Sequence, residues 1–282
     1  MTMFTIHFLK GRKHLLILLT ACLFTAKLPG QTAWYTTRNA HSHNDYEQKT
    51  PYWLAYEHEF GSIEADIFLG DYDLIVAHDT SELKLNRSFK TLYLENMDSC
   101  VRKNSGYPYP DSSRNLQLLI DIKTDSAKTL QKIIDLLKLY PALTRNRHIF
   151  FVITGNMPDA RTFGEFPDFI LFDGVLSRNY TRGQLSKIRM LSDDFRQYSK
   201  WQGEGQIPAE DVRKIRSRIE NAHREGKQVR LWGAPDSGNA WTRLIQLQVD
   251  FINTDHIFDL AEFLQRNRFR YSSPENGIIS FK

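Results

Sequence analysis

The sequence has few cysteines and no apolar run long enough to cross a bilayer. Its two cysteines are Cys22 and Cys100. Cys22 lies in an N-terminal segment that we expect to be removed, so neither an internal disulfide nor a cysteine-based zinc site is expected. The apolar run from Leu15 to about Ala26 falls well short of the roughly 20 apolar residues that span a membrane.

A basic segment precedes this apolar run, and the two together are typical of an export signal. We therefore predict a signal peptide at 1–31 and a mature chain at 32–282 that is exported, either periplasmic or secreted. Leu19-Thr20-Ala21-Cys22 also resembles a lipobox, which makes a lipoprotein anchored through Cys22 the alternative. The apolar run continues past Cys22, which argues against that alternative.

Without this leader the chain has no excess of positive charge. The 37 basic side chains outnumber the 33 acidic ones only by the four in the leader, which are Lys10, Arg12, Lys13 and Lys27. A neutral mature chain lacks the electrostatic footprint of a nucleic-acid-binding protein, so we expect no nucleic-acid partner. A length of 282 residues fits one globular domain, expected as a monomer.

Strand-like and helix-like segments alternate from about Thr37 onward. Near-continuous apolar strands between amphipathic helices predict a parallel sheet covered on both faces. The fold class is therefore α/β, a single (β/α)8 TIM barrel, for which about 250 residues suffice. The expected strands are 62–69, 74–77, 116–122, 148–154, 169–176, 228–232 and 249–253, and the expected helices are 126–139, 209–225 and 241–248.

Two segments break the alternation, 95–115 and 192–208. The first is rich in Ser, Asn, Pro and Tyr, and the second carries aromatic residues and glycines. Long irregular loops in a barrel are either functional or surface insertions, and the sequence leaves both interpretations open.

Three pairs of polar residues, each two residues apart, stand within or just after strands. His41 and His43 follow a first strand that precedes 62–69, Glu64 and Asp66 lie within 62–69, and Asp121 and Lys123 stand at the end of 116–122. Residues i and i+2 of a strand point to the same face. Unpaired buried charges are costly, so we expect the three pairs to meet and satisfy one another. The C-terminal mouth of a barrel is where side chains from different strands converge.

The three carboxylates Glu64, Asp66 and Asp121 offer oxygen ligands and no sulfur. This set suits one divalent cation, Mg²⁺ or Ca²⁺. His78 ends another apolar segment and can join the histidines after the first strand as a general acid or base. Asp79, beside it, either orients His78 or caps the next turn.

Four motifs, in this order, resemble the phospholipase C-like phosphodiesterase superfamily, which includes glycerophosphodiester phosphodiesterases and phosphatidylinositol-specific phospholipases C. They are Ala40-His41, Ile63-Glu64-Ala65-Asp66-Ile67, Val76-Ala77-His78-Asp79 and Leu119-Ile120-Asp121-Ile122-Lys123. The similarity covers about 38–260. His43-Asn44-Asp45-Tyr46 is similar to a bacterial and fungal branch with the pattern His-Asn-Asp-Tyr.

The resemblance implies a metal-dependent phosphoric diester hydrolase that uses two histidines for acid/base catalysis. The substrate would be a glycerophosphodiester or a phospholipid-type headgroup, with peripheral membrane contact in the second case. The resemblance implies that Glu64, Asp66 and Asp121 bind the metal. It also implies that His78 and either His41 or His43 act as general acid and base, and that Lys123 contacts the phosphate. Asn44 and Trp232 would line the substrate pocket.

The chain departs from the superfamily after the first strand. Glycerophosphodiesterases commonly carry His-Arg-Gly there, whereas this chain has His41-Ser42-His43-Asn44. The phosphate-gripping arginine is therefore missing, and either histidine can be the catalytic one. His41 aligns with the Ala-His pattern and is favoured. Trp232 has a second interpretation, as a core aromatic residue.

Two other function classes stay open. A His-x-His pair after a first strand also begins amidohydrolase-type barrels, which need further histidines, here from His148, His223 or His256. A non-catalytic exported barrel that binds a phospho-headgroup or a glycan is the other, because fold does not dictate function.

Overall fold

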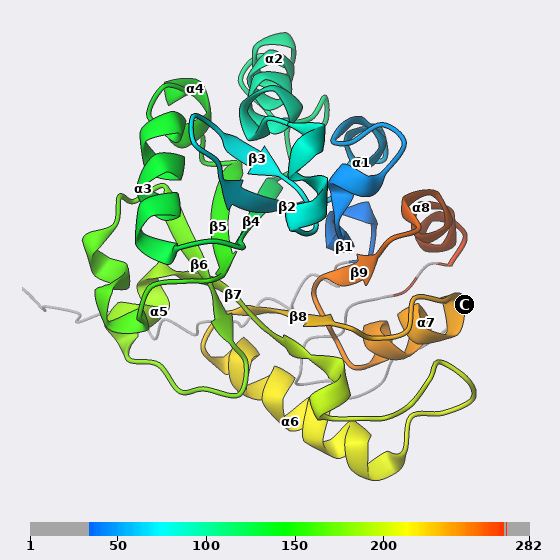
Figure 1. The fold of residues 1–282 in the computed structure, drawn as a ribbon. Coiled ribbons are helices and arrows are strands. Elements are labelled where there is room, and N and C mark those ends of the chain that lie inside the picture. The colour runs from blue at the N-terminus through cyan, green and yellow to red at the C-terminus, as the bar shows by residue number, and fades with distance from the viewer. Residues whose placement is uncertain (1–33, 268, 270–282) are drawn as a thin grey trace, which may run out of the picture. The chain divides into compact units, whose positions relative to one another are not determined.

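Eight parallel strands form the centre of the molecule, and helices lie around them (Figure 1). This arrangement comes from a computed structural model, which describes residues 34–267 and 269. The predicted leader and the alternative lipidation site at Cys22 lie outside these residues. The strands pair in the order β8-β7-β6-β5-β4-β2-β1-β9, all parallel, with β3 antiparallel to β2.

The strands are β1 Ala40–Ser42, β2 Ser62–Leu69, β3 Leu74–Val76, β4 Leu116–Ile122, β5 Ile149–Gly155, β6 Ile170–Val175, β7 Ile188–Asp194, β8 Gln228–Trp232 and β9 Ile252–Thr254. The α-helices are α1 Trp53–Glu57, α2 Glu95–Lys103, α3 Ser126–Leu137, α4 Pro141–Thr144, α5 Arg182–Lys187, α6 Ala209–Arg224, α7 Gly238–Gln246 and α8 Ile257–Arg266.

The barrel is nearly closed between β8 and β9. Arg230 of β8 forms a single parallel bridge with Phe251, just before β9. The carbonyl oxygen of Val229 accepts from the N–H groups of Asp250 and Phe251, at 3.0 and 3.1 Å. The predicted (β/α)8 TIM-barrel class is confirmed, with an almost closed ring of parallel strands.

The prediction for β3 was wrong in one respect, because this segment is not a barrel strand. Leu74–Val76 pairs antiparallel with Ile67–Leu69 of β2. Only four residues, 70–73, separate the two strands, and a parallel return needs a crossover of a dozen or more residues. The apolar composition that suggested a parallel strand is explained by burial in a hairpin.

Both segments expected to be irregular contain regular structure. The segment 95–115 begins with α2, whose buried Met97, Cys100 and Val101 have helical spacing. The segment 192–208 begins with the last three residues of β7. The sequence did not predict this strand because its polar residues interrupt the apolar pattern. Ser192, for example, is buried because its hydroxyl donates a hydrogen bond to Asp173 at 2.7 Å.

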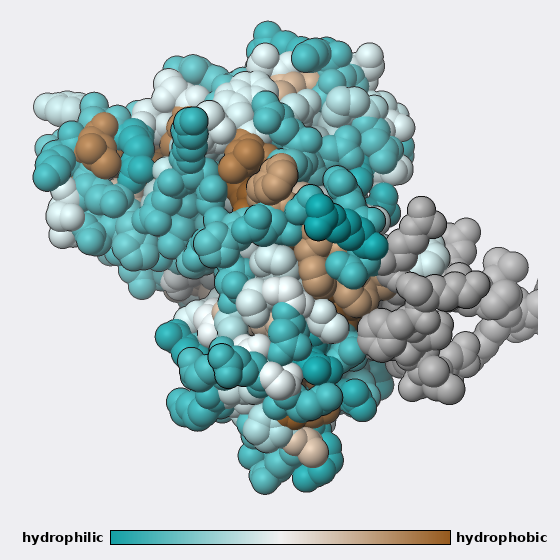
Figure 2. Space-filling model, turned by 90° about the vertical axis from the view of Figure 1, so that its right-hand side faces the viewer, coloured by the Kyte–Doolittle hydropathy of each residue, from teal (hydrophilic) through white to brown (hydrophobic). Residues whose placement is uncertain are grey.

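On the face in Figure 2, hydrophilic residues predominate and apolar ones form separate patches. Some large apolar side chains are exposed, among them Tyr72, Phe258 and Trp232. Isolated exposed apolar residues are normal in globular proteins. Among the described helices, none has the length and apolarity to cross a membrane.

Candidate metal and acid/base site

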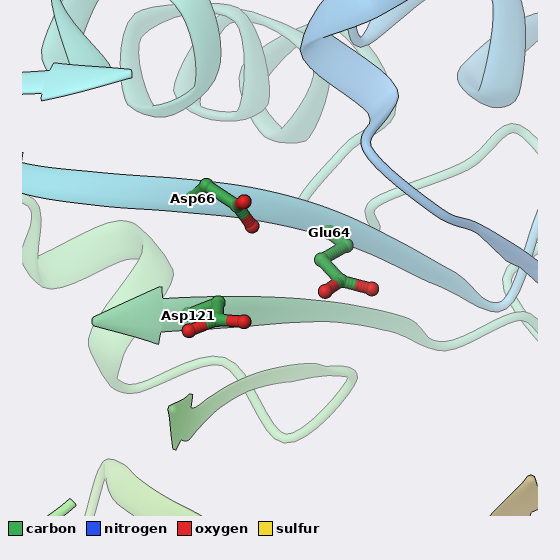
Figure 3. A group of neighbouring side chains, drawn as sticks. All are labelled: Glu64, Asp66 and Asp121. Carbon is green, nitrogen blue, oxygen red and sulfur yellow. The ribbon is translucent and has the colours of Figure 1, made fainter. Parts of the chain in front are cut away.

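The carboxylates of Glu64, Asp66 and Asp121 converge inside the barrel. Asp66 of β2 and Asp121 of β4 are register partners in adjacent parallel strands. Figure 3 shows the three side chains reaching from these two strands toward one space. One oxygen from each lies within 4.8 Å of the others. The convergence expected from the residue spacing is therefore present.

The electrostatics of this cluster fit a cation. Burial, then the charges of Glu64 and Asp121, raises the pKa of the Asp66 carboxyl to about 6. Burial likewise raises the pKa of Asp121. Burial also acts upward on Glu64, but Arg230 and His41 outweigh it and lower the pKa of Glu64 below its ordinary value. Three crowded carboxylates destabilise one another, and a divalent cation would relieve that repulsion.

Two carboxylate oxygens without a hydrogen-bond partner, here called orphaned, mark where such an ion would bind. Oδ1 of Asp66 and Oδ1 of Asp121 are buried and have no hydrogen-bond partner. Their Oδ2 atoms are both contacted by Lys123, whose Nζ lies 2.9 Å from Asp66 and 2.8 Å from Asp121. Buried polar atoms are rarely left unpaired. The cluster thus leaves free the oxygens that oxygen-preferring cations use.

His41 lies beneath the cluster and is fully buried. Its Nδ1 is 2.8 Å from Ser62 Oγ, and its Nε2 is 2.7 Å from Glu64 Oε2 and 2.8 Å from Arg230 Nη1. Burial, assisted by Arg230, lowers the pKa of His41 to about 4. Both ring nitrogens are engaged inside the barrel, so the geometry gives His41 a structural position.

His43 lies at the mouth, with its side chain 32% exposed. Its Nδ1 is 2.7 Å from Asp255 Oδ1, just after β9. Burial lowers the pKa of His43, but the hydrogen bond to Asp255 and the charge of Glu64 outweigh this effect and raise it. Of the two histidines after the first strand, His43 thus reaches the mouth of the barrel, whereas both ring nitrogens of His41 have partners in the interior.

His78 faces the same cluster from the end of β3. Its Nδ1 lies 3.2 Å from the hydroxyl of Tyr46 and 3.9 Å from Asp66 Oδ2. The side chain is 53% exposed, so substrate and water can reach the ring. Asp79 does not orient it: its carboxylate accepts from Ser81 N–H and caps the following 3-10 segment, Thr80–Leu85.

Asn44 and Trp232, the expected pocket residues, are both near the mouth. Asn44 has a left-handed backbone, with φ 44°, and its side chain contacts the Tyr46 hydroxyl at 3.0 Å. Trp232 ends β8, is 38% exposed, and has the Arg196 guanidinium 5.6 Å from its ring centroid. Trp232 is therefore not a core residue.

Two site residues had no role assigned from the sequence, Arg230 and Asp255. Arg230 is only 4% exposed and donates to Glu64 Oε2 at 2.8 Å, so it offsets charge under the site rather than replacing the missing phosphate-binding arginine. A charged residue between Val229 and Leu231 of an apolar strand was the available signal. Asp255 gave only the weaker signal of an acidic residue directly after a strand.

None of the three histidines considered for an amidohydrolase-type site joins the carboxylate cluster, and His256 is the N-cap of α8. His148 precedes β5 and is 2.9 Å from Asn115 Oδ1, and His223 of α6 is 2.8 Å from Asp250 Oδ2. Within residues 34–267 and 269, the one cluster of at least three potential metal ligands contains no histidine. The arrangement therefore matches an oxygen-ligated site.

Comparisons with known proteins show similarity to a phosphodiesterase domain family. A sequence profile of the AIM6-like phosphodiesterase domain matches residues 33–158. Altered inheritance of mitochondria protein 6 of Kluyveromyces lactis is 25% identical over 300 residues, covering 80% of this chain and 72% of its own. A homolog of it from Arthroderma benhamiae is 25% identical over 258 residues, covering 77% and 81%.

Among solved structures, a glycerophosphodiester phosphodiesterase from Parabacteroides distasonis has a similar fold. The TM-score is 0.52 at 13% sequence identity, and the match covers 81% of this chain and 97% of that one. At this identity the likeness concerns the fold alone.

Proposed function

We propose that this chain is a metal-dependent phosphoric diester hydrolase of the phospholipase C-like phosphodiesterase superfamily, supported by the profile match and by the similar barrel fold. The observation that carries the proposal is the cluster of Glu64, Asp66 and Asp121, with two orphaned oxygens, between two accessible histidines. The proposed substrate is a glycerophosphodiester or a phospholipid-type headgroup. The proposed cofactor is one Mg²⁺ or Ca²⁺ held by the three carboxylates.

A cation bound there would supply positive charge to offset the charge that develops on the phosphoryl oxygens. Lys123, held by Asp66 and Asp121, adds a second positive charge beside it. Its pKa is raised because these carboxylates outweigh burial, so it stays protonated.

Proton transfer falls to His43 and His78. Each uses Nδ1 for a protein contact, His43 to Asp255 and His78 to Tyr46, which leaves Nε2 for exchange. In the proposed reaction one imidazole removes the proton of the attacking hydroxyl and the other protonates the leaving alcohol. We assign His43 rather than His41, because both ring nitrogens of His41 are occupied in the barrel interior.

The assay of purified protein on a phosphodiester panel tests this proposal. An aryl phosphodiester, glycerophosphocholine and phosphatidylinositol vesicles are each tested with Mg²⁺, with Ca²⁺ and with chelator. We expect activity that chelator abolishes, and a loss of at least about 10²-fold in His78→Ala, the low end for a general acid or base. His148→Ala is the matched control, because this histidine precedes β5, away from the cluster, and should keep wild-type rates.

Wild-type rates in His78→Ala, or activity that persists in chelator, would rule out the mechanism. Retention of a phosphodiester without product over long incubation would instead support the non-catalytic binding barrel. Activity on vesicles but not on glycerophosphocholine would identify a lipid substrate and peripheral membrane contact.

Export and a monomeric state are part of the proposal. The leader expected at 1–31 would direct the protein out of the cytoplasm, and its removal would leave Cys100 as the only cysteine. N-terminal sequencing of the mature protein and its elution volume in size-exclusion chromatography test these two points. A lipid-modified N-terminal Cys22 would favour the lipoprotein alternative.

A further inference from the structure

Tyr46 connects a candidate metal ligand to a candidate proton-transfer group. We propose that Tyr46 is a positioning residue that holds His78 in the tautomer protonated on Nδ1, leaving Nε2 to exchange protons. The catalytic consequence of this inference rests on the proposed function, whereas the tautomer does not. Tyr46 belongs to the 3-10 segment Asp45–Glu47 and stands three residues after the catalytic candidate His43.

The contacts of the Tyr46 hydroxyl are short and protected from water. Tyr46 is 1% exposed. Its Oη lies 2.8 Å from Asp66 Oδ2, 3.0 Å from Asn44 Oδ1 and 3.2 Å from His78 Nδ1. Within the described residues, the Tyr46 hydroxyl is the only hydrogen-bond partner of the His78 ring.

Counting protons fixes the direction of these hydrogen bonds. A phenol has one proton to donate, and an ionised carboxylate only accepts. The charged acceptor forms the stronger bond, so the phenol proton goes to Asp66 rather than to the neutral amide oxygen of Asn44. The phenol oxygen is then an acceptor toward His78, and Nδ1 of His78 must carry the proton.

One ion pair fixes the backbones of both partners. Arg87 donates to the carbonyl oxygen of Tyr46 at 3.0 Å and to Glu82 Oε2 at 2.6 Å. The same Glu82 oxygen accepts from the backbone N–H of His78 at 3.0 Å. Arg87 also stacks over the Tyr46 ring, 5.3 Å from its centroid. The relative position of phenol and imidazole is therefore set independently of the hydrogen bond between them.

The variant that tests this inference is Tyr46→Phe, which removes only the hydroxyl. Tyr93→Phe is the matched control, because Tyr93 is equally buried and its hydroxyl donates to another buried carboxylate, Asp45, at 3.1 Å. Asp45 is not among the candidate ligands. Both variants lose a buried hydrogen bond from a phenol to a carboxylate, and only Tyr46→Phe also loses the contact with His78. An effect that is common to the two variants is therefore structural.

The first measurement is the ¹⁵N NMR spectrum of the His78 ring in the full-length protein with Mg²⁺. It is recorded at alkaline pH, because the two tautomers of a neutral imidazole give different ¹⁵N shifts at Nδ1 and Nε2. We expect Nδ1–H in the wild type and in Tyr93→Phe, and a shift toward Nε2–H in Tyr46→Phe. A wild-type spectrum with Nε2–H, or identical tautomers in wild type and Tyr46→Phe, would overturn the inference.

The second measurement is turnover of the best substrate. We expect kcat of Tyr46→Phe to fall at least about tenfold with little change in KM, because a misplaced proton impairs transfer and not binding; in serine proteases a wrong histidine tautomer costs up to about 10⁴-fold. An equal loss in Tyr93→Phe would refute a positioning role. A chain without any phosphodiesterase activity would defeat the proposed function, while the NMR result would still decide the role of Tyr46.

Discussion

Asp121 can occupy its position only because its neighbour on β5 has no side chain. Gly155 is the last residue of β5 and has φ +74°. A Cβ at this position would lie 1.9 Å from Oδ1 of Asp121, the orphaned oxygen of the cluster. The glycine is therefore required by close approach as well as by its backbone conformation.

Gly155→Ala should displace the Asp121 carboxylate and weaken binding of Mg²⁺ or Ca²⁺ by at least about tenfold, the lower end for changes beside a metal ligand. Isothermal titration calorimetry measures the affinity. Gly226→Ala is the control, since Gly226 has a similar φ of +70° but open space around its Cβ position. It carries the same backbone strain without the clash. Equal metal affinities in the two variants would contradict the hypothesis that Gly155 makes room for the Asp121 carboxylate.

At the scale of elements, α3 shows how local patterning produces a helix. The Asp125 side chain caps its N-terminus by accepting from Lys128 N–H. Four of its apolar residues recur at helical spacing and are buried, which fixes the face that packs on the barrel: Leu130, Ile133, Ile134 and Leu137. The predicted helix 126–139 ended two residues too late, because helix ends fray and carry weaker signals than the stripe.

Ile133→Ala should lower the free energy of unfolding by about 2–5 kcal/mol, the range for truncating a fully buried aliphatic residue. Lys132→Ala, on the exposed face of the same helix, should change it by less than about 0.5 kcal/mol. Urea denaturation of both variants measures the difference. Similar values for the two would mean that α3 does not pack through the stripe.

At the scale of the whole molecule, the barrel interior is unusual in being partly ionic. Arg230 of β8 lies 2.8 Å from Glu64 of β2 and 3.7 Å from Asp173 of β6. Asp173 also accepts from Ser192 Oγ at 2.7 Å and Thr154 Oγ1 at 3.3 Å. Burial nevertheless raises the pKa of Asp173 to about 7, despite the opposing charge of Arg230.

This raised pKa makes stability depend on pH with a defined sign. In the unfolded chain Asp173 loses its proton near pH 4, whereas the folded protein keeps it up to about pH 7. The folded state therefore binds more protons in this window, and its stability falls as pH rises from about 4 to 7. Each pKa unit corresponds to about 1.4 kcal/mol, so the contribution amounts to several kcal/mol.

Asp173→Asn should remove that fall, because an amide does not ionise. Free energies of unfolding from urea titrations between about pH 4 and 7 should rise relative to wild type as pH increases. The comparison with wild type is needed because His41, with its pKa lowered to about 4, contributes with the opposite sign. Asp135→Asn, an exposed change on α3, should leave the wild-type slope intact. A constant difference between Asp173→Asn and wild type would refute the assignment.

The sequence by itself determined the fold class and the central carboxylates. Strand and helix periodicities are local, so they can be recognised in the sequence without knowing which elements pack against each other. Side chains two residues apart in a strand share a face, and this rule alone placed Glu64 with Asp66 on the inner surface of β2. Parallel strands then brought Asp121 beside them, as expected for the mouth of a barrel.

Tertiary structure decided which histidine is accessible and which partners orient the site. His41 and His43 share a strand face by spacing, yet one is enclosed by Glu64 and Arg230 and the other pairs with Asp255. His43 and Asp255 are 212 residues apart in the chain, and Glu64 and Arg230 are 166 apart. Such pairs depend on strand register and barrel closure, which no local pattern encodes, and burial then sets their proton affinities.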